Sequence, residues 1–430
     1  MVFLTIIVIF FNEKTQAEFR SALIVPPSPQ WHGTKQMGVT GNLTNGMGIT
    51  NDGLGNIYIT GHTTGGLAGQ TQIGDLDLFI HKYNFGGVLQ GSIQLGMKDE
   101  MIWGDHITTD RIGNVYVTGI INGKLPGQNT SEPSYILKYS SNGVLQWAKP
   151  LTMLVVSAIT ADHAGNILAT GFTMSGEWPH DTGQLLIQKY NSNGALLWKR
   201  QVGPVGKRTA SLGMTINPAG NIFIVGFTNG KFFGQKNTSY VDVKKYELLI
   251  QKYNSNGALQ WSRQMKLANK DTFAQAITND HLGYLYITGV TAVNTDPLKA
   301  QAFVQKYDAK GVLLGSKQMG TENGNTQGMA IASDRNGNIY TSGFTTVSLF
   351  GQAQTGKLDL YVQKIDSSGF ISWTRQMGSV NEKTTAQAIT VDRFSNVYIT
   401  GGTSGGLDGN TQSGLTDLFI QKYNTNGVLQ

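Results

Sequence analysis

The chain has 430 residues, of which 55 are glycine, 10 are proline and none is cysteine, and charged residues make up 14%. Abundant glycine with little charge is typical of short strands joined by turns and excludes the charged composition of a disordered chain. The lack of cysteine excludes disulfides, thiol catalysis and thiolate metal sites. The net charge of +6 comes without the basic run that would predict binding to nucleic acid or to a membrane surface.

The first 22 residues are expected to be a signal or leader segment. An apolar run at residues 2–11 is too short for a membrane span of about 20 residues but has the length of a secretory h-region. Cleavage is expected after Ala17 or Ala22, although only Met1 precedes the run and a basic n-region is missing. A disordered tail is the alternative. Residues 23–30 contain three prolines and are expected to form an extended linker.

From Trp31 onward the chain is organised around a ten-residue motif that occurs seven times. Its first copy is Asp-Gly-Leu-Gly-Asn-Ile-Tyr-Ile-Thr-Gly at residues 52–61. The other copies lie at residues 110–119, 162–171, 217–226, 280–289, 334–343 and 392–401. A period of about 57 residues indicates one supersecondary unit per copy, and such a unit needs its neighbours to bury its faces.

Each unit is expected to contain four strands, which we call A to D. Strand A ends at the start of the motif, as in residues 275–280, and strand B is the Asn-Ile-Tyr-Ile-Thr-Gly of the motif. Strand C is Leu-Phe-Ile-Gln-Lys-Tyr at residues 418–423, and strand D is illustrated by residues 257–265. These segments are rich in β-branched and aromatic residues and are bounded by Gly, Asn, Ser and Asp.

The connections predict how the four strands are arranged. Asp-x-x-Gly-Asn between strands A and B allows the Asp side chain to accept backbone hydrogen bonds while Gly supplies a positive φ. Tyr-Asn-Ser-Asn-Gly between strands C and D, at 190–194 and 253–257, is a hairpin turn of the same chemistry. The B–C and D–A connections are longer and variable. One face should therefore carry tight turns and the other face variable loops.

Seven such sheets arranged radially make a seven-bladed β-propeller of four-stranded antiparallel blades, which is the predicted fold of residues 31–430. An open β-solenoid fits less well, because its coils repeat at roughly 20–30 residues.

Two register positions predict where strands lie relative to the axis. One position of strand A is small in six units and His106 in the seventh, which suggests that these strands converge near the axis. The small residues are Gly48, Ala158, Gly213, Ala276, Ala330 and Ala388. One position of strand D is Trp in five units and Gly in two, and we expect each Trp to pack between adjacent blades. These residues are Trp31, Trp147, Trp198, Trp261 and Trp373, with Gly91 and Gly315.

The ring is expected to close between the two ends of the repeat region. The last unit stops at residues 427–430, where a strand D has barely begun, whereas residues 31–37 resemble a strand D without its preceding strands. Residues 31–37 should therefore form the outer strand of the last blade, with residues 427–430 starting the same edge.

The repeat resembles the SBBP family, which is named for its seven-bladed β-propeller repeat. The resemblance rests on the ten-residue motif followed by Asp-Leu-Phe-Ile-x-Lys-Tyr-Asn-x-x-Gly-x-Leu-x-Trp, and it covers residues 31–430. The Asp before strand C is present at Asp77, Asp359 and Asp417 but absent at Pro133, Gln184 and Gln301. The resemblance implies the propeller fold. It also implies a bacterial protein that lies outside the cytoplasm, either secreted or in the cell envelope. It implies no catalytic residue.

Familiar catalytic and metal-binding patterns are missing from the sequence. One Asp per A–B turn is too few oxygens for a calcium loop, so turn capping is the preferred interpretation. The seven His residues lack the spacing of a zinc site, and no Gly-x-Ser-x-Gly or phosphate loop follows a strand and opens a helix. We therefore expect no metal, no cofactor and no catalytic residue.

Function in a repeat scaffold is expected where the repeat is broken on the variable-loop face. Trp103 precedes the second unit and Trp178 lies in the B–C loop of the third, so both loops belong to one sector. Aromatic, carboxylate and imidazole groups together are suited to binding a sugar or a partner protein. The candidate ligand-binding residues are Trp103, Asp105, His106, Trp178, His180 and Asp181. The alternative is that each Trp only pins a long loop.

Two functions remain open. The first is a non-enzymatic binding or adhesion scaffold, monomeric and secreted or envelope-bound, which presents its loop face to a protein or glycan. The second is a glycan lyase or hydrolase with a site in the axial funnel, where only Asp105 and His106 break an otherwise uncharged strand A pattern. The sequence favours binding, with no nucleic-acid partner and no membrane span.

Overall fold

The structure is a computed structural model that describes residues 31–125, 132–175, 182–232, 246–265, 270–292 and 299–430. The expected leader at residues 1–22 and the linker at residues 23–30 lie outside the described residues. Within the described part of the chain, no helix is long and apolar enough to cross a membrane.

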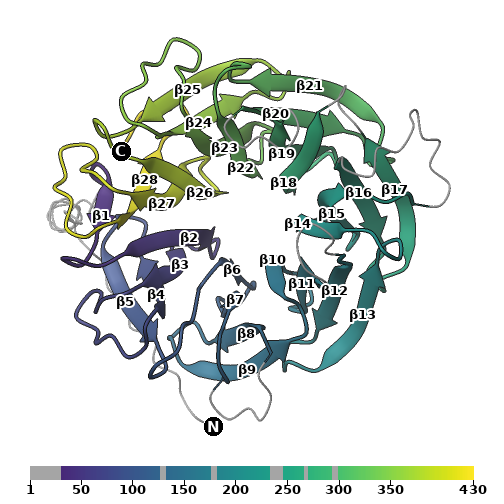
Figure 1. The fold of residues 1–430 in the computed structure, drawn as a ribbon, viewed down its shortest axis with the longest axis horizontal. Coiled ribbons are helices and arrows are strands. Elements are labelled where there is room, and N and C mark those ends of the chain that lie inside the picture. The colour runs from purple at the N-terminus through teal and green to yellow at the C-terminus, as the bar shows by residue number, and fades with distance from the viewer. Residues whose placement is uncertain (1–30, 126–131, 176–181, 233–245, 266–269, 293–298) are drawn as a thin grey trace, which may run out of the picture.

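The described residues form seven four-stranded antiparallel sheets arranged around a central axis (Figure 1). Blade 1 contains β2 (Thr44–Asn51), β3 (Ile57–Thr63), β4 (Asp77–Tyr83) and β5 (Leu89–Leu95); blade 2 contains β6 (His106–Thr109), β7 (Val115–Ile120), β8 (Ser134–Tyr139) and β9 (Leu145–Leu151); blade 3 contains β10 (Val155–Ala161), β11 (Ile167–Phe172), β12 (Leu185–Tyr190) and β13 (Leu196–Val202).

The remaining strands complete the ring in the same order. Blade 4 contains β14 (Thr209–Ile216), β15 (Ile222–Thr228), β16 (Glu247–Tyr253) and β17 (Leu259–Met265); blade 5 contains β18 (Asp271–Asn279), β19 (Leu285–Ala292), β20 (Ala300–Tyr307) and β21 (Leu313–Met319); blade 6 contains β22 (Thr326–Ser333), β23 (Ile339–Thr345), β24 (Asp359–Ile365) and β25 (Ile371–Met377); blade 7 contains β26 (Thr384–Val391), β27 (Val397–Thr403), β28 (Asp417–Tyr423) and β1 (Lys35–Met37). The predicted seven-bladed fold is confirmed.

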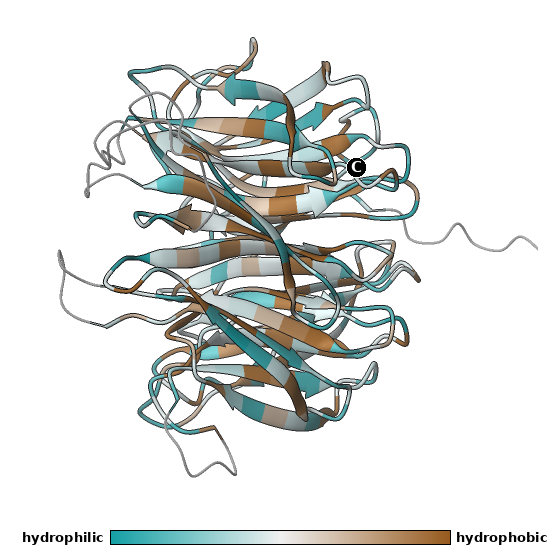
Figure 2. Cartoon of the chain, turned by 90° about the vertical axis from the view of Figure 1, so that its right-hand side faces the viewer, coloured by the Kyte–Doolittle hydropathy of each residue, from teal (hydrophilic) through white to brown (hydrophobic). Residues whose placement is uncertain are grey.

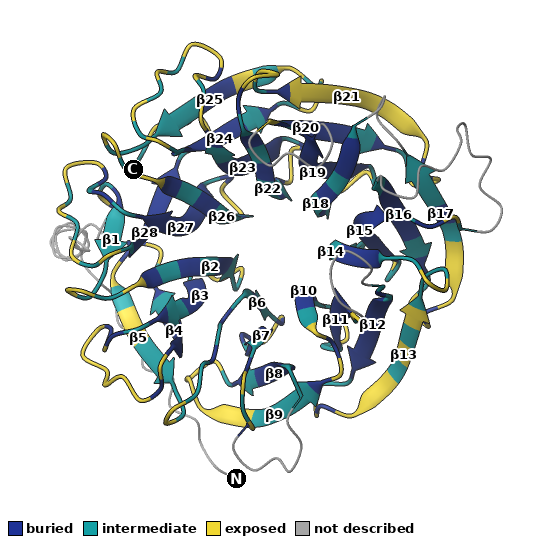
Figure 3. Cartoon of the chain, viewed as in Figure 1, coloured by how far each residue is buried: buried dark blue, intermediate teal, exposed yellow. Residues whose placement is uncertain are grey.

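The hydrophobic core lies between blades. One buried cluster joins Ile80 of blade 1 to Val117 and Leu137 of blade 2, and comparable clusters follow around the ring. Strands B and C are buried along almost their whole length, while strand D is partly exposed in most blades and β21 is exposed along most of its length (Figure 3). In side view, apolar and hydrophilic bands alternate along the strands (Figure 2). Each blade therefore buries its apolar face only against its neighbour, as the repeat predicts.

The Asp of the motif caps the A–B turn as predicted. Asp110 Oδ1 accepts hydrogen bonds from the amides of Ile112 (3.1 Å) and Asn114 (2.9 Å). Its Oδ2 accepts from Asn114 Nδ2 (2.7 Å) and from the Tyr116 hydroxyl (3.0 Å). The turn carboxylate therefore fixes both the turn and the Tyr of strand B, and its lone pairs are occupied by structural donors.

The small residues of strand A lie where the blades converge. A Cβ added to Gly213 would lie 2.9 Å from the Cα of Ala276 in the next blade. A Cβ added to Gly48 would lie 3.0 Å from the Asp105 carbonyl oxygen and 3.1 Å from the Ile107 amide. Strands A approach one another too closely for larger side chains, which explains the small residues at this position.

The Trp of strand D joins one blade to the next, as the sequence predicts. Tyr116, Lys138 and Trp147 lie opposite one another across β7, β8 and β9. Trp147 packs on Gly194 in the C–D turn of blade 3, and its indole nitrogen donates to the Ser192 carbonyl (3.2 Å). Lys138 Nζ donates to the same carbonyl (2.8 Å). We call the aligned positions of strands B, C and D the seam row.

The chain ends close the ring as predicted. In β1, Lys35, Gln36 and Met37 pair with residues 420, 419 and 418 of β28. Farther along the same edge, the Gln430 amide donates to the Lys422 carbonyl (2.9 Å).

The Trp31 side chain is buried, its ring lies 5.6 Å from that of Tyr398, and it packs on Gly87 in the C–D turn of blade 1. The predicted register of Trp31 is wrong by two residues, because β1 pairs Met37 with Leu418 and this places Gly33 at the position opposite Lys422. The indole therefore fills the space between blades 7 and 1 from two residues outside the aligned position.

We predict that two truncations separate this closure from the segment before it. Deleting residues 1–29 should leave the melting temperature nearly unchanged. Deleting residues 1–38 removes β1 and a buried Trp, which should destabilise the domain by about 3 to 5 kcal/mol and expose a sheet edge that promotes aggregation. Calorimetry and light scattering measure both effects. Equal stability of the two truncations would contradict closure through β1.

Candidate functional site

Three of the six candidate residues lie together at the inner edge of blade 2. Trp103 and Asp105 continue the pairing of β6 with β7 beyond His106. The Trp103 amide donates to the Ile120 carbonyl (2.9 Å), and the Asp105 amide donates to the Thr118 carbonyl (2.9 Å). The Tyr135 hydroxyl donates to the Trp103 carbonyl. Trp178, His180 and Asp181 lie outside the described residues, so the expected meeting of the two Trp loops stays a prediction.

A hollow of about 190 Å³ lies on the axis and is lined by strand A of every blade. Its walls are mostly aliphatic and small side chains, and His106 is the titratable residue among those that line it. Its other polar lining residues are Ser157, Gln275 and Gln387. The axial surface of the described residues thus offers hydrogen-bonding groups in an apolar setting, with one imidazole.

Burial changes the protonation of the two titratable residues at this edge. Burial raises the pKa of Asp105 to about 6. Burial lowers the pKa of His106 to about 4, although a hydrogen bond with the backbone of Val156 opposes the shift. At pH 7 the imidazole is therefore neutral and the carboxyl is mostly ionised, and a moderate fall in pH protonates the carboxyl.

Among the described residues, no group of three or more His, Asp or Glu side chains is arranged to hold a metal ion. The buried carboxylates that start strand C are occupied by loop contacts. Asp77 accepts from the amides of Ile73 (2.9 Å) and Gly74 (2.8 Å) and from Gln94 Nε2 (2.7 Å). These carboxylates hold B–C loops in place.

The B–C loops of blades 1, 6 and 7 share this anchor but differ at their tips. Asp359 and Asp417 bind their loop amides as Asp77 does. In each loop the residue after a buried Leu adopts a positive φ and is exposed. These residues are Ala68 (φ 51°), Phe350 (φ 46°) and Asp408 (φ 53°). Phe350 is 52% exposed, which is unusual for an aromatic residue in a left-handed conformation.

Two grooves in the outer wall were not expected from the sequence. They lie at Gly91 and Gly315, the two positions where the seam row has Gly in place of Trp. The groove between blades 1 and 2 has a volume of about 550 Å³, and the groove between blades 5 and 6 has about 290 Å³. The sequence showed that Gly replaces Trp at these two positions. It could not show that the next blade keeps its usual distance, which is what leaves a groove there.

Three stretches of the chain match the beta-propeller repeat SBBP, at residues 33–68, 315–351 and 372–408. The chain contains SBBP repeats. Each matching stretch starts in or just before a strand D, passes through strands A and B of the next blade and ends at a B–C loop tip. The SBBP matches thus reach into blades 1, 6 and 7, whose loops share the Asp anchor.

A search of curated proteins finds no match to the sequence. Solved propellers of very different sequence are similar in structure. The WD40 beta propeller domain of Doa1 is 8% identical, with 91% of this chain and 96% of that chain covered and a TM-score of 0.49. An ulvan lyase, a polysaccharide lyase, is 12% identical, with coverages of 92% and 94% and a TM-score of 0.48. The beta-propeller domain of the Trilobed protease from Pyrococcus furiosus is 9% identical, with coverages of 92% and 99% and a TM-score of 0.44.

We predict that ionisation of the buried Asp105 carboxyl destabilises the folded chain as the pH rises. Its folded pKa lies above its unfolded pKa, so between about pH 4 and pH 6 the folded chain binds more protons than the unfolded chain. Asp105→Asn should therefore raise the free energy of unfolding by about 1 to 3 kcal/mol at pH 7 and by little at pH 4.

Urea unfolding at the two pH values measures this difference, and Asp75→Asn, at an exposed Asp, is the matched control. The His residues are the same in all three proteins, so their titration cancels. A gain that is equal at pH 4 and pH 7 would contradict the assignment.

Proposed function

We propose that this protein is a non-enzymatic binding scaffold that works outside the cytoplasm, secreted or attached to the envelope. It presents the face that carries the B–C and D–A connections to a protein or glycan ligand. Trp103 and Phe350 are the described aromatic residues that we assign to this face, and Trp178, His180 and Asp181 extend the assignment to residues outside the described part.

The single observation that carries this proposal is the shared construction of three loops with different tips. The buried Asp–amide anchor fixes the loop backbone in blades 1, 6 and 7, so the tip position is held in one conformation. The tip side chain itself changes from Ala68 to Phe350 to Asp408. The Asp408 carboxylate accepts from the Thr34 amide (2.9 Å), so the tips that are available to a ligand are those of blades 1 and 6. Scaffold folds commonly carry binding residues in this way, on exposed loop tips that vary while the loop backbone is held by constant contacts.

The axial lining also supports binding over catalysis. Acid–base catalysis needs convergent titratable groups with suitable pKa values. On the described strand A residues, Asp105 and His106 come from one blade, and the other blades contribute aliphatic, Ser and Gln side chains around the hollow. Such a surface can hold a ligand by contact and hydrogen bonds.

The proposed location rests on the sequence. Residues 2–11 have the length and apolarity of a secretory h-region, and a chain without cysteine is compatible with an oxidising compartment. Fractionation of cells that express the full chain tests the proposal, because the protein should be found outside the cytoplasm.

One observation favours the alternative of a glycan-active enzyme. A carboxyl with a pKa of about 6 near the axis can be protonated under mildly acidic conditions and could act as a general acid. In this case a polysaccharide would be cleaved by the native protein, and both Asp105→Asn and His106→Ala would lower the rate at least 100-fold. Assays of reducing ends on a polysaccharide panel test this alternative. Cleavage lost in both variants would overturn the non-enzymatic proposal.

We predict that the loop-face aromatic residues carry the binding energy. Trp103→Ala and Phe350→Ala should each weaken the binding of a ligand found on a glycan or surface-protein array by about 10-fold or more, because aromatic anchors dominate such interfaces. The melting temperature of Phe350→Ala should change by less than about 2 °C, since Phe350 is 52% exposed.

Phe370→Ala is the matched control, because Phe370 is 70% exposed and follows the C–D turn on the opposite face. Its binding should equal that of the native protein. A large fall in melting temperature with unaltered binding in Trp103→Ala would show that this side chain only pins its loop. Weaker binding in the control alone would move the site to the tight-turn face.

A further inference from the structure

The two grooves of the outer wall share their geometry with seams that hold an indole ring. In blade 6 the seam row is Tyr340, Lys364 and Trp373, and in blade 5 it is Tyr286, Lys306 and Gly315. A Cβ added to Gly315 would meet no atom within 4 Å. The same is true of Gly91 in blade 1. Open space therefore lies where five other blades place an indole.

The filled seams show what such a space accepts. The Trp373 ring lies 6.1 Å from the Tyr340 ring, and its indole nitrogen donates to the carbonyl of Thr425 in the C–D turn of blade 7 (3.0 Å). The guanidinium of Arg375, two residues along β25, lies 5.7 Å from the indole centroid. The indole is thus bounded by a Tyr ring and a cation and has an acceptor for its N–H group.

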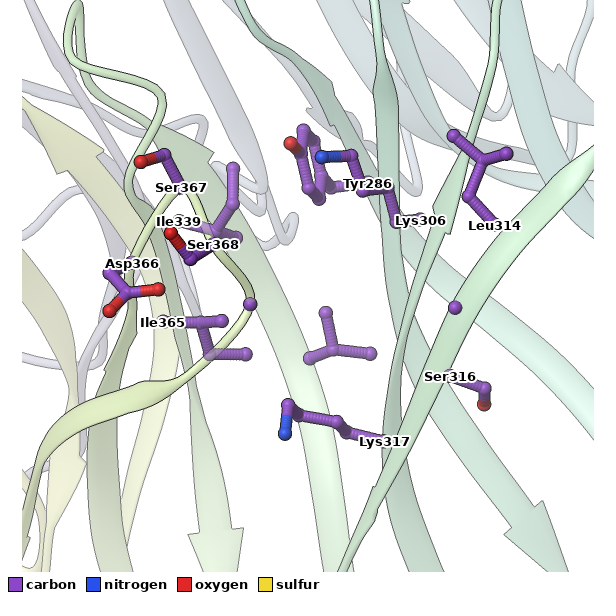
Figure 4. Close-up of a pocket in the computed structure, with 13 residues that line it drawn as sticks. Tyr286, Lys306, Leu314, Ser316, Lys317, Ile339, Ile365, Asp366, Ser367 and Ser368 are labelled. Carbon is purple, nitrogen blue, oxygen red and sulfur yellow. The ribbon is translucent and has the colours of Figure 1, made fainter.

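The groove at Gly315 has the same three groups around it: a Tyr ring, a cation and a turn that can accept a hydrogen bond. The Tyr286 hydroxyl donates to Asp280 (3.0 Å), which holds its ring in the position that Tyr340 has in blade 6. Lys317 stands two residues after Gly315, where Arg375 stands after Trp373. Ser367, in the C–D turn of blade 6, has the place of Thr425. Figure 4 shows Tyr286, Lys306 and Lys317 from blade 5 on one side and the Ser367–Ser368 turn on the other.

The groove is large enough for a two-ring group and is reached from outside. An apolar cavity of about 150 Å³ holds benzene, and this groove has about 290 Å³. Its outer strand β21 is exposed along most of its length (Figure 3), unlike β25 of blade 6, which carries a Trp.

We propose that the groove at Gly315 is a binding site for the indole side chain of a Trp in a partner polypeptide. Tyr286 forms one wall for the indole, Lys317 contributes a cation to it, and the turn of blade 6 accepts its N–H hydrogen bond. The groove is lined by Lys306, Lys317 and one carboxylate, Asp366, so its charge is positive on balance and favours a Trp flanked by acidic residues. The groove at Gly91 is a weaker site, because Ile93 stands there in place of the cation. This site lies on the rim and is independent of the loop-face proposal.

The test uses the full chain and N-acetyl-5-fluorotryptophan amide, followed by fluorine NMR. The probe signal should broaden in the presence of the protein and sharpen again when N-acetyltryptophan amide competes. N-acetylcyclohexylalanine amide, which is apolar but has neither a π system nor an N–H donor, should compete at least about 10-fold less well.

Variants locate the site. Gly315→Trp places the chain's own indole in the groove, so it should remove most of the broadening and raise the melting temperature by a few degrees. Gly91→Trp is the matched control and should retain most of the broadening. Lys317→Ala leaves the groove open and should weaken probe binding several-fold without a change in melting temperature.

Three results would overturn the proposal. The first is an absence of broadening with the native protein. The second is unchanged broadening in the protein that carries both Gly315→Trp and Gly91→Trp. The third is competition by methyl β-glucoside that matches competition by the indole, because this would make the groove a sugar site. None of these results depends on whether the loop face binds a ligand.

Discussion

The contact on which the ring most depends is the seam row. There a Lys of strand C and, in most blades, the indole of a Trp meet the C–D turn of the next blade beside an apolar or aromatic side chain of strand B. Propeller blades bury their apolar faces only against one another, so each blade needs a contact that sets its distance and rotation. The indole of Trp147 meets Gly194 where any Cβ would lie 3.2 Å from the ring, and Lys138 reaches the same turn. Closure reuses this contact, since Trp31 supplies the indole that blade 7 lacks in its own C-terminal segment.

The seam row also explains why the turns are so constant while the loops vary. The tight-turn face must supply an acceptor carbonyl and a Gly to the preceding blade, and in five blades the motif Asp also accepts a hydrogen bond from the Tyr of strand B. Changes there disturb two blades at once. In blades 1, 6 and 7 the B–C loop is held by the Asp anchor and by a Gln of strand D that accepts a hydrogen bond from the amide of the buried Leu before the tip. The tip side chain still differs, as Ala68, Phe350 and Asp408 show. Binding residues can change on this face at little cost to stability.

Most of the fold was predictable because each sequence pattern that specifies a strand or a turn occurs in several of the seven units. The Asp turns, the small residues near the axis, four of the Trp seams and the closing strand follow from register positions in the sequence. Trp31 does not, because β1 puts Gly33 at the aligned position. The site was less predictable. Gly91 and Gly315 were visible as exceptions, but only the placement of the neighbouring turns shows that the space stays open. The pKa of Asp105 depends on burial that no spacing reveals, and Trp178, His180 and Asp181 lie outside the described residues.

Hydrogen exchange of the outer strands tests most directly whether the indole holds each seam. The account predicts that amides of β5 and β21, which belong to the blades with Gly in the seam row, exchange faster than the paired amides of β13, β17 and β25, which carry a Trp. All five strands pair with their strand C in the same register, so the comparison reports the effect of having Trp or Gly in the seam row. Equal protection in the two groups would contradict the account.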